Sequence, residues 1–129
     1  MRDDEPGVRF EFANDESAPS LARRALSPMF DGPADPIADA VTLTASELVT
    51  NVVRHTDSTG VMQAWDPTPD IPLRLEVEDH DPAIPVIVDE PVVGGRGLMI
   101  VDTLADAWGV EPTADGKVVW AEFNRPPAE

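Results

Sequence analysis

Apolar and polar residues in the first half of the chain alternate first with period two and then with helical spacing. Residues 8–12 alternate apolar and charged side chains, which is typical of a half-buried β-strand. Between Ala18 and Met29 apolar residues recur every three or four positions, which predicts an amphipathic helix. The same spacing predicts a longer helix from Pro36 to Thr56, with Asp35 as its N-cap.

After His55 the pattern returns to period two, and one further helix is indicated by a glycine-rich turn followed by a mainly apolar run. Three prolines interrupt a stretch without a helical stripe, which we interpret as a loop or lid. An Asp-Gly pair between two apolar runs is a hairpin signal. We expect strands at 59–65, 73–78, 108–110 and 119–123, a lid at 83–93, a helix from 97 to 104 and a hairpin turn at 113–116.

This order of elements predicts an α+β fold: a two-layer α/β sandwich with a mixed, mainly antiparallel sheet and helices on one face. The chain has 129 residues, which lies within the usual range of one domain. We therefore expect a single domain over 1–129, with a core at about 8–123 and frayed termini.

Composition narrows the classes of function. There is no cysteine, so disulfides and thiolate metal sites are excluded, and no apolar run is long enough to span a bilayer. We expect a soluble, cytoplasmic protein. The net charge of −16 argues against direct nucleic-acid binding. Any phosphate site must be built locally, from backbone amides, a divalent cation and a few basic side chains.

The long central helix carries the first candidate site. Glu47 and Asn51 lie four residues apart and therefore on one face, and Arg54 and His55 follow one turn later. A carboxylate, a carboxamide, a guanidinium and an imidazole thus gather near one end of the helix. The alternative interpretation is a solvated helix face with ordinary pairing between neighbouring turns.

Two further candidates lie later in the chain. Asp79 follows a strand, where a carboxylate can accept hydrogen bonds from an exocyclic amine, although it could instead simply cap a turn. Residues 94–98 form a glycine-rich turn that leads into a helix N-terminus, which favours an anion such as phosphate. The alternative for this turn is a flexible corner.

Taken together, these motifs resemble a known family. The pattern is E-L-V-x-N-x-x-x-H, then a strand ending in Asp, then G-x-G-L opening a helix, then a G-K-x-V-W strand. It resembles the histidine-kinase-like ATPase superfamily with its Bergerat fold, and within it the small, single-domain actinobacterial anti-sigma-factor serine kinases. The resemblance covers roughly Phe10 to Phe123.

The resemblance implies binding of ATP and Mg²⁺ and gives each motif a role. Asn51 would ligate Mg²⁺, Glu47 would be the catalytic residue that orients or deprotonates a substrate serine, and Asp79 would hold the adenine amine. The residues that it implies around the phosphates are Arg54, His55, Gly95, Arg96, Gly97 and Leu98.

It also implies a regulatory function: an anti-sigma factor that phosphorylates a serine of an anti-sigma antagonist protein, binds a sigma factor and can form a homodimer. Two departures leave alternatives open. The family's D-x-G-x-G box is replaced here by residues 79–83, and Val118 stands where a threonine is frequent. The alternatives are a nucleotide- or sigma-binding switch without phosphoryl transfer, and an interaction domain that binds no nucleotide.

Overall fold

The computed structural model describes residues 5–126, with the exception of 33, 67, 69 and 84–96. Five strands, three α-helices and one short 3-10 helix occur in these residues. In chain order they are β1 (Val8–Phe12), α1 (Ala18–Leu26), η1 (Ser27–Met29), α2 (Ala38–His55), β2 (Gly60–Trp65), β3 (Leu73–Asp79), α3 (Gly97–Leu104), β4 (Ala107–Pro112) and β5 (Lys117–Phe123).

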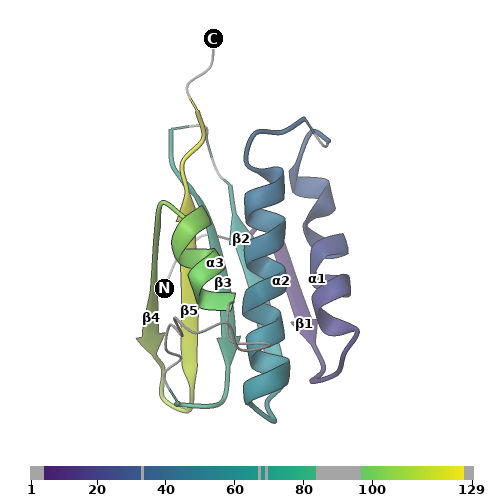
Figure 1. Cartoon of the computed structure of the whole chain (residues 1–129), viewed down its shortest axis with the longest axis vertical. Helices are drawn as coiled ribbons and strands as arrows, with labels where there is room; N and C mark the ends of the chain where they lie inside the picture. The colour runs from purple at the N-terminus through teal and green to yellow at the C-terminus, as the bar shows by residue number, and fades with distance from the viewer. Residues whose placement is uncertain (1–4, 33, 67, 69, 84–96, 127–129) are drawn as a thin grey trace.

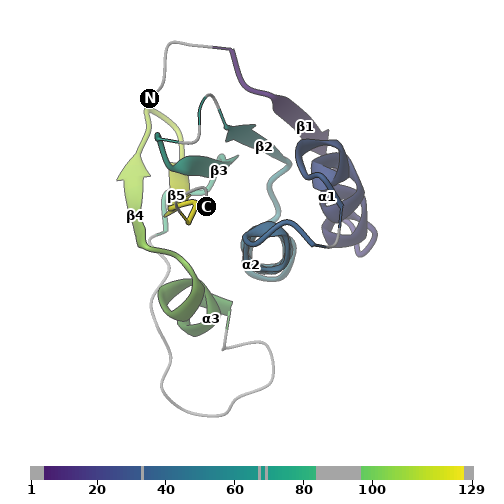
Figure 2. The ribbon, with the colours of Figure 1, turned by 90° about the horizontal axis from the view of Figure 1, so that it is seen from above.

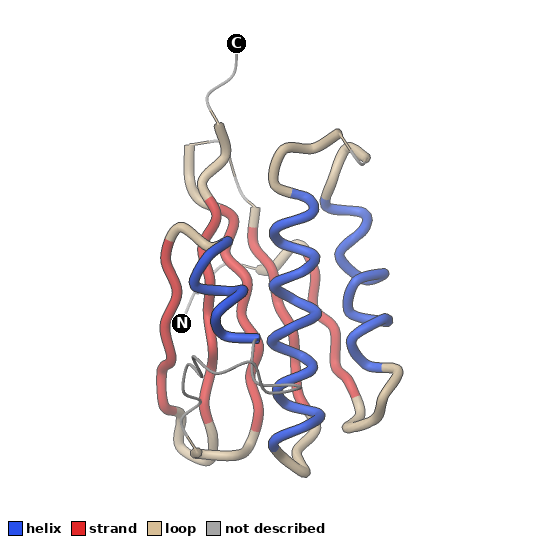
Figure 3. The backbone as a smooth tube through the Cα atoms, in the orientation of Figure 1, coloured by secondary structure: helices blue, strands red, loops and turns tan. Residues whose placement is uncertain are grey.

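The strands form one sheet in the order β1-β2-β3-β5-β4 (Figure 3). Every pairing between described strands is antiparallel. The three α-helices cover one face of this sheet, as the view from above shows (Figure 2). The α+β sandwich with helices on one face is thus confirmed, and the sheet is antiparallel rather than mixed.

Apolar and charged residues alternate along the strands, and the apolar ones form the core. In β3 the residues Leu73, Leu75 and Val77 are almost fully buried among the residues of the core. They share this core with buried side chains of α2 such as Leu48 and Val52. Each such side chain stabilises the fold by about 1.5–3 kcal/mol through removal of apolar surface from water. The charged residues between them point to the other face of the sheet.

Helix α2 begins two residues later than predicted, at Ala38, with Ile37 in the N-cap position. The prediction of Asp35 as N-cap is therefore wrong. The carboxylate of Asp35 accepts from the backbone N–H of Ile37 at 3.2 Å, within a turn that precedes the helix. It also pairs with Arg125 at 3.0 Å, so a residue ninety positions away decides where this carboxylate points.

The predicted first helix is continuous only to Leu26, and Ser27–Met29 form the 3-10 helix η1. Pro28 explains the change, because it has no N–H to donate to the carbonyl four residues earlier. Arg23 and Arg24 lie on the exposed side of α1, which is the amphipathic arrangement predicted for this helix.

The ends of several helices and strands that carry the predicted site residues lie at the same end of the molecule (Figure 1). The last turns of α2, the end of β3 and the beginning of β5 lie at the lower end in this view, and α3 begins nearer to mid-height. The antiparallel pairing of β3 with β5 causes this, because it sets the last residue of β3 beside the first residue of β5. None of the described helices is both long and apolar enough to cross a membrane.

Candidate functional site

The C-terminal half of α2 presents the four polar residues that the sequence singled out. Glu47 and Asn51 are half-buried, and Arg54 and His55 are exposed in the last turn. Buried apolar residues between them, such as Leu48, hold the opposite side of the helix in the core. Within the part of the chain that the structure describes, none of the four side chains forms a hydrogen bond or ion pair, so their polar groups remain available.

A single asparagine fixes the end of α2. The side-chain amide of Asn14 donates to the carbonyl oxygens of Val52 at 3.3 Å, Thr56 at 3.0 Å and Ser58 at 2.8 Å. The carbonyl of Val52 also accepts from the N–H and the hydroxyl of Thr56. The Asn14 contact fixes the residues that leave the helix, where backbone carbonyls are no longer paired within it. The loop between β1 and α1 thereby positions Arg54 and His55. Asn14 is a site-supporting residue that the sequence analysis did not single out.

Hydrogen bonds continue from this point to the end of β3. The backbone N–H of His80 donates to the hydroxyl of Ser58 at 2.9 Å. The imidazole Nδ1 of His80 lies 3.1 Å from a carboxylate oxygen of Asp115 in the β4–β5 turn. His80 therefore links the loops that follow α2, β3 and β4.

Asp79 is the last residue of β3 and is only 2% exposed. Its Oδ1 accepts from the backbone N–H of Asp81 at 2.8 Å, which is the turn contact that the alternative interpretation expected. It does more than cap this turn, however. The ammonium Nζ of Lys117 lies 3.1 Å from Oδ1 and 3.1 Å from Oδ2 of Asp79. A buried ion pair thus lies where the sequence resemblance implies that the adenine ring of ATP binds.

Lys117 is a residue that the sequence analysis missed. In the β3–β5 register it pairs with Asp79, two positions before the pair Val77 and Val119. It therefore points to the helix-covered face, and it is 6% exposed. The signal was present in the alternation: Val119, Ala121 and Phe123 are the core side of this strand, and Lys117 has the same parity.

The absence of threonine at position 118 has no bearing on the site. Val118 pairs with Glu78, so both side chains point to the face of the sheet opposite the helices. A hydroxyl at this position could not reach Asp79 on the other face. The departure at Val118 therefore gives no reason to doubt that a nucleotide binds beside Asp79.

The loop that replaces the family's glycine box is ordered by its own side chains. Asp79 accepts from the N–H of Asp81, and the carboxylate of Asp81 accepts from the N–H of Ala83 at 2.9 Å. These are two successive Asx-turns, in which a side chain substitutes for a backbone turn contact. No described residue other than glycine has a positive φ, so this path needs no glycine. The ammonium of Lys117 also donates to the carbonyl of Asp81 at 2.8 Å.

The predicted phosphate loop is described only in part. Gly95, Arg96 and residues 84–93 of the predicted lid lie outside the described residues. Gly97 is the first residue of α3, and the side chain of Leu98 is buried in the core at 4% exposure. Any contact of Leu98 with a phosphate would therefore come from its backbone.

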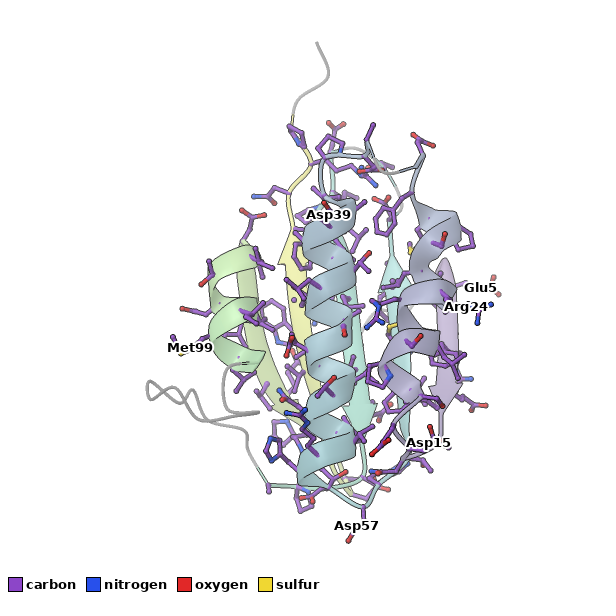
Figure 4. The ribbon with its side chains drawn as sticks, turned by 45° about the vertical axis from the view of Figure 1, so that its right-hand side comes forward. Glu5, Asp15, Arg24, Asp39, Asp57 and Met99 are labelled. Carbon is purple, nitrogen blue, oxygen red and sulfur yellow. The ribbon has the colours of Figure 1, made fainter. Side chains whose placement is uncertain are left out.

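A cavity of about 550 Å³ lies beside α2, next to the β1–α1 loop. Asp15, which lines it, projects from that loop near the lower end of α2 (Figure 4). Among the residues predicted to bind nucleotide, the cavity includes only Arg54. The described residues hold no group of three or more histidine, cysteine, aspartate or glutamate side chains suited to a metal. The lining residues are Asn14, Asp15, Glu16, Pro19, Thr50, Val53 and Arg54.

The chain was compared with known proteins. A family model described as "Histidine kinase-like ATPase domain" matches residues 12–123. No curated protein sequence matches the chain. A similar solved structure contains the RsbU and RsbW domains of Rv1364c from Mycobacterium tuberculosis, with a TM-score of 0.67 and 18% identity. This match covers 98% of the chain but 35% of that protein chain, and it shows the fold.

A second solved structure is the histidine kinase domain of the blue-light activated histidine kinase EL346 from Erythrobacter litoralis. The identity is 26% and the TM-score 0.47, over 68% of this chain and 44% of that one.

Proposed function

Because the chain belongs to the histidine kinase-like ATPase family, we propose that it binds ATP with Mg²⁺ and transfers the γ-phosphate to a serine of a partner protein. The observation that carries this proposal is the pair Glu47 and Asn51. Both are half-buried on α2, both lack an internal partner among the described residues, and α2 ends at the same end of the molecule as Asp79. Their carboxylate and carboxamide can therefore contact a ligand from solvent without first breaking an internal hydrogen bond among the described residues.

Asn51 is suited to hold the metal. Mg²⁺ prefers oxygen ligands and keeps several waters, so one carboxamide oxygen together with phosphate oxygens is sufficient. When bound, the ion would neutralise negative charge on the phosphates. Such neutralisation is needed here because the chain itself carries a net charge of −16. Arg54 and His55, one turn later, would add positive charge at the phosphate end.

Glu47 would orient the serine hydroxyl and accept its proton. It lies one helical turn before Asn51, which places an acceptor beside the metal ligand. Phosphoryl transfer depends mainly on positioning and on stabilisation of charge, so one well-placed carboxylate is a sufficient base.

The partners follow from the sequence resemblance to anti-sigma-factor serine kinases. We infer that the phosphate acceptor is an anti-sigma antagonist protein and that the chain also binds a sigma factor, in the cytoplasm. The nucleotide-binding switch of the same fold, which transfers no phosphate, is the alternative outcome of the transfer experiment below.

The first experiment measures ATP binding by calorimetry with and without Mg²⁺. We expect Mg²⁺-dependent binding that Asn51→Ala abolishes and that Asn124→Ala, at an exposed asparagine after β5, leaves within about twofold. Equal affinity of Asn51→Ala and the original chain would remove Asn51 from the site. Absence of ATP binding by the original chain would favour an interaction domain.

The second experiment measures transfer of radiolabelled phosphate to candidate antagonist domains. We expect Glu47→Gln to keep ATP affinity within a few-fold, about 1 kcal/mol or less, and to lose most of the transfer. Glu11→Gln, on the exposed side of β1, is the matched control and should transfer normally. ATP binding without transfer to any antagonist would identify the switch instead.

A further inference from the structure

Lys117 stands beside the carboxylate that is proposed to hold the adenine amine. We propose that Lys117 reads the base directly: its ammonium donates a hydrogen bond to N1 of adenine, while Asp79 accepts from the adjacent exocyclic amine. This inference rests on the proposed ATP binding and adds a second specificity-determining residue to it.

The first step of the argument is burial. The side chains of Lys117 and Asp79 are 7% and 2% exposed, and charged side chains are rarely buried so completely unless they are paired. Replacing such an ion pair by apolar residues frequently costs no stability. The need for a stable fold therefore does not by itself account for two buried charges at this position.

The second step is an inventory of hydrogen bonds. An ammonium has three N–H donors. In the described part of the chain, that of Lys117 forms two hydrogen bonds, with Oδ1 of Asp79 at 3.1 Å and with the carbonyl of Asp81 at 2.8 Å. Oδ1 of Asp79 also accepts from the N–H of Asp81. Oδ2 lies 3.1 Å from the same ammonium as its ion-pair partner, but it accepts no hydrogen bond among the described residues. One donor of Lys117 and the Oδ2 acceptor of Asp79 are left, side by side.

The third step is complementarity. Adenine presents an amine donor at C6 next to the acceptor N1, and this pair matches one free acceptor and one free donor at adjacent positions. Guanine presents the reverse order, a carbonyl at C6 and an N–H at N1. A carboxylate alone would test only the amine. With Lys117 beside it, the site forms hydrogen bonds with both the amine and N1. A nucleobase that leaves Lys117 or Asp79 buried without a hydrogen-bond partner binds much more weakly.

The test uses the unmodified chain and two ATP analogues, with dissociation constants measured by calorimetry. In 1-deaza-ATP a C–H replaces N1, and in 7-deaza-ATP a C–H replaces N7 on the other side of the amine. We expect 1-deaza-ATP to bind at least about tenfold more weakly than ATP, and 7-deaza-ATP within about threefold. Equal binding of ATP and 1-deaza-ATP would overturn the inference and leave the proposed function intact. If ATP itself does not bind, both are wrong.

A variant distinguishes direct contact from a structural role. Lys117→Met should bind ATP and 1-deaza-ATP equally, because the donor that N1 requires is gone. A merely structural lysine would weaken both ligands by the same factor and preserve their ratio. Since Lys117→Met leaves Asp79 unpaired, the double variant Asp79→Val/Lys117→Met serves where the single variant does not fold, because it removes both charges and places no new donor beside N1. A persisting preference for ATP over 1-deaza-ATP in either variant would contradict the proposal.

Discussion

A Cβ atom on Gly116 would lie 2.0 Å from the carbonyl oxygen of Asp79 and 2.7 Å from the Cα of His80. The turn between β4 and β5 therefore rests directly on the backbone at the end of β3, with no room for a side chain. This close approach, together with the pairing of Lys117 and Asp79 across β5 and β3, brings the ammonium to the buried carboxylate.

We predict that Gly116→Ala lowers the free energy of unfolding by about 2 kcal/mol or more, because backbone atoms cannot yield as a flexible side chain can. Urea denaturation measures this. Gly7→Ala is the control: its Cβ would lie 3.1 Å from the flexible end of Met29 and at an ordinary contact distance of 3.7 Å from the carbonyl oxygen of Ala64, so a loss of about 1 kcal/mol or less is expected. Equal losses in the two variants would show that the turn moves freely away from β3.

Asn14→Ala should destabilise the end of α2. The variant removes the Asn14 donor from the carbonyls of Val52, Thr56 and Ser58, and we expect a loss of about 1–2 kcal/mol. Among the described residues, only the carbonyl of Val52 keeps other donors, the N–H and the hydroxyl of Thr56. Hydrogen exchange should show faster opening of the last turn of α2 than of its middle. Unchanged exchange in this turn would mean that Asn14 does not hold the helix end.

Thr44→Val should stabilise the protein by about 1 kcal/mol, because the fully buried hydroxyl of Thr44 has no hydrogen-bond partner among the described residues. Thr56→Val provides the opposite case. The hydroxyl of Thr56 donates to Val52 at 2.8 Å and accepts from Ser58 at 3.0 Å, so its loss should cost about 1 kcal/mol. Thermal unfolding of both variants checks the prediction, and it fails if both shift in the same direction.

Arg125 lies in the segment after β5, for which we predicted fraying, and its ion pairs with Asp35 and Asp66 attach this segment to the loops before α2 and after β2. Its guanidinium lies 3.0 Å from Asp35 and 2.6 Å from Asp66, and the hydrogen bond with Asp66 is the main cause that raises the pKa of Arg125. Arg125→Met should lower the free energy of unfolding by about 2 kcal/mol, since both carboxylates lose their partner. Arg9→Met removes an exposed pair with Glu11 and should cost about 0.5 kcal/mol or less. Comparable losses would contradict an anchoring role for Arg125.

The hydroxyl and then the backbone N–H of Ser17 hold the pKa of Asp15 below its ordinary value, because both donate to the carboxylate. A lowered pKa means that this contribution to stability is present above the pKa of the unfolded chain and is lost as the pH falls through that of the folded state. Ser17→Ala should raise the pKa of Asp15 toward its ordinary value, as NMR titration of the carboxyl carbon can measure. Ser20→Ala, on the exposed side of α1, should leave it unchanged.

The sequence by itself determined the elements and the polar face of α2. Period-two and helical spacing need only the local chain, and burial of one face then selects strand or helix, so β3 and α2 were found with small errors at their ends. Glu47 and Asn51 share a face for the same local reason, since a helix repeats every 3.6 residues.

Only the tertiary structure decided which distant groups pair. Asp35 is held by Arg125, and Asn14 reaches the end of α2, through contacts that no local pattern encodes. The register of β5 on β3 turns Lys117 toward Asp79 and Val118 away from it, and a shift of one residue would exchange the two. The physical reason is that a strand's spacing fixes which side chains share a face, whereas packing against its neighbours fixes which face is buried and what lies opposite.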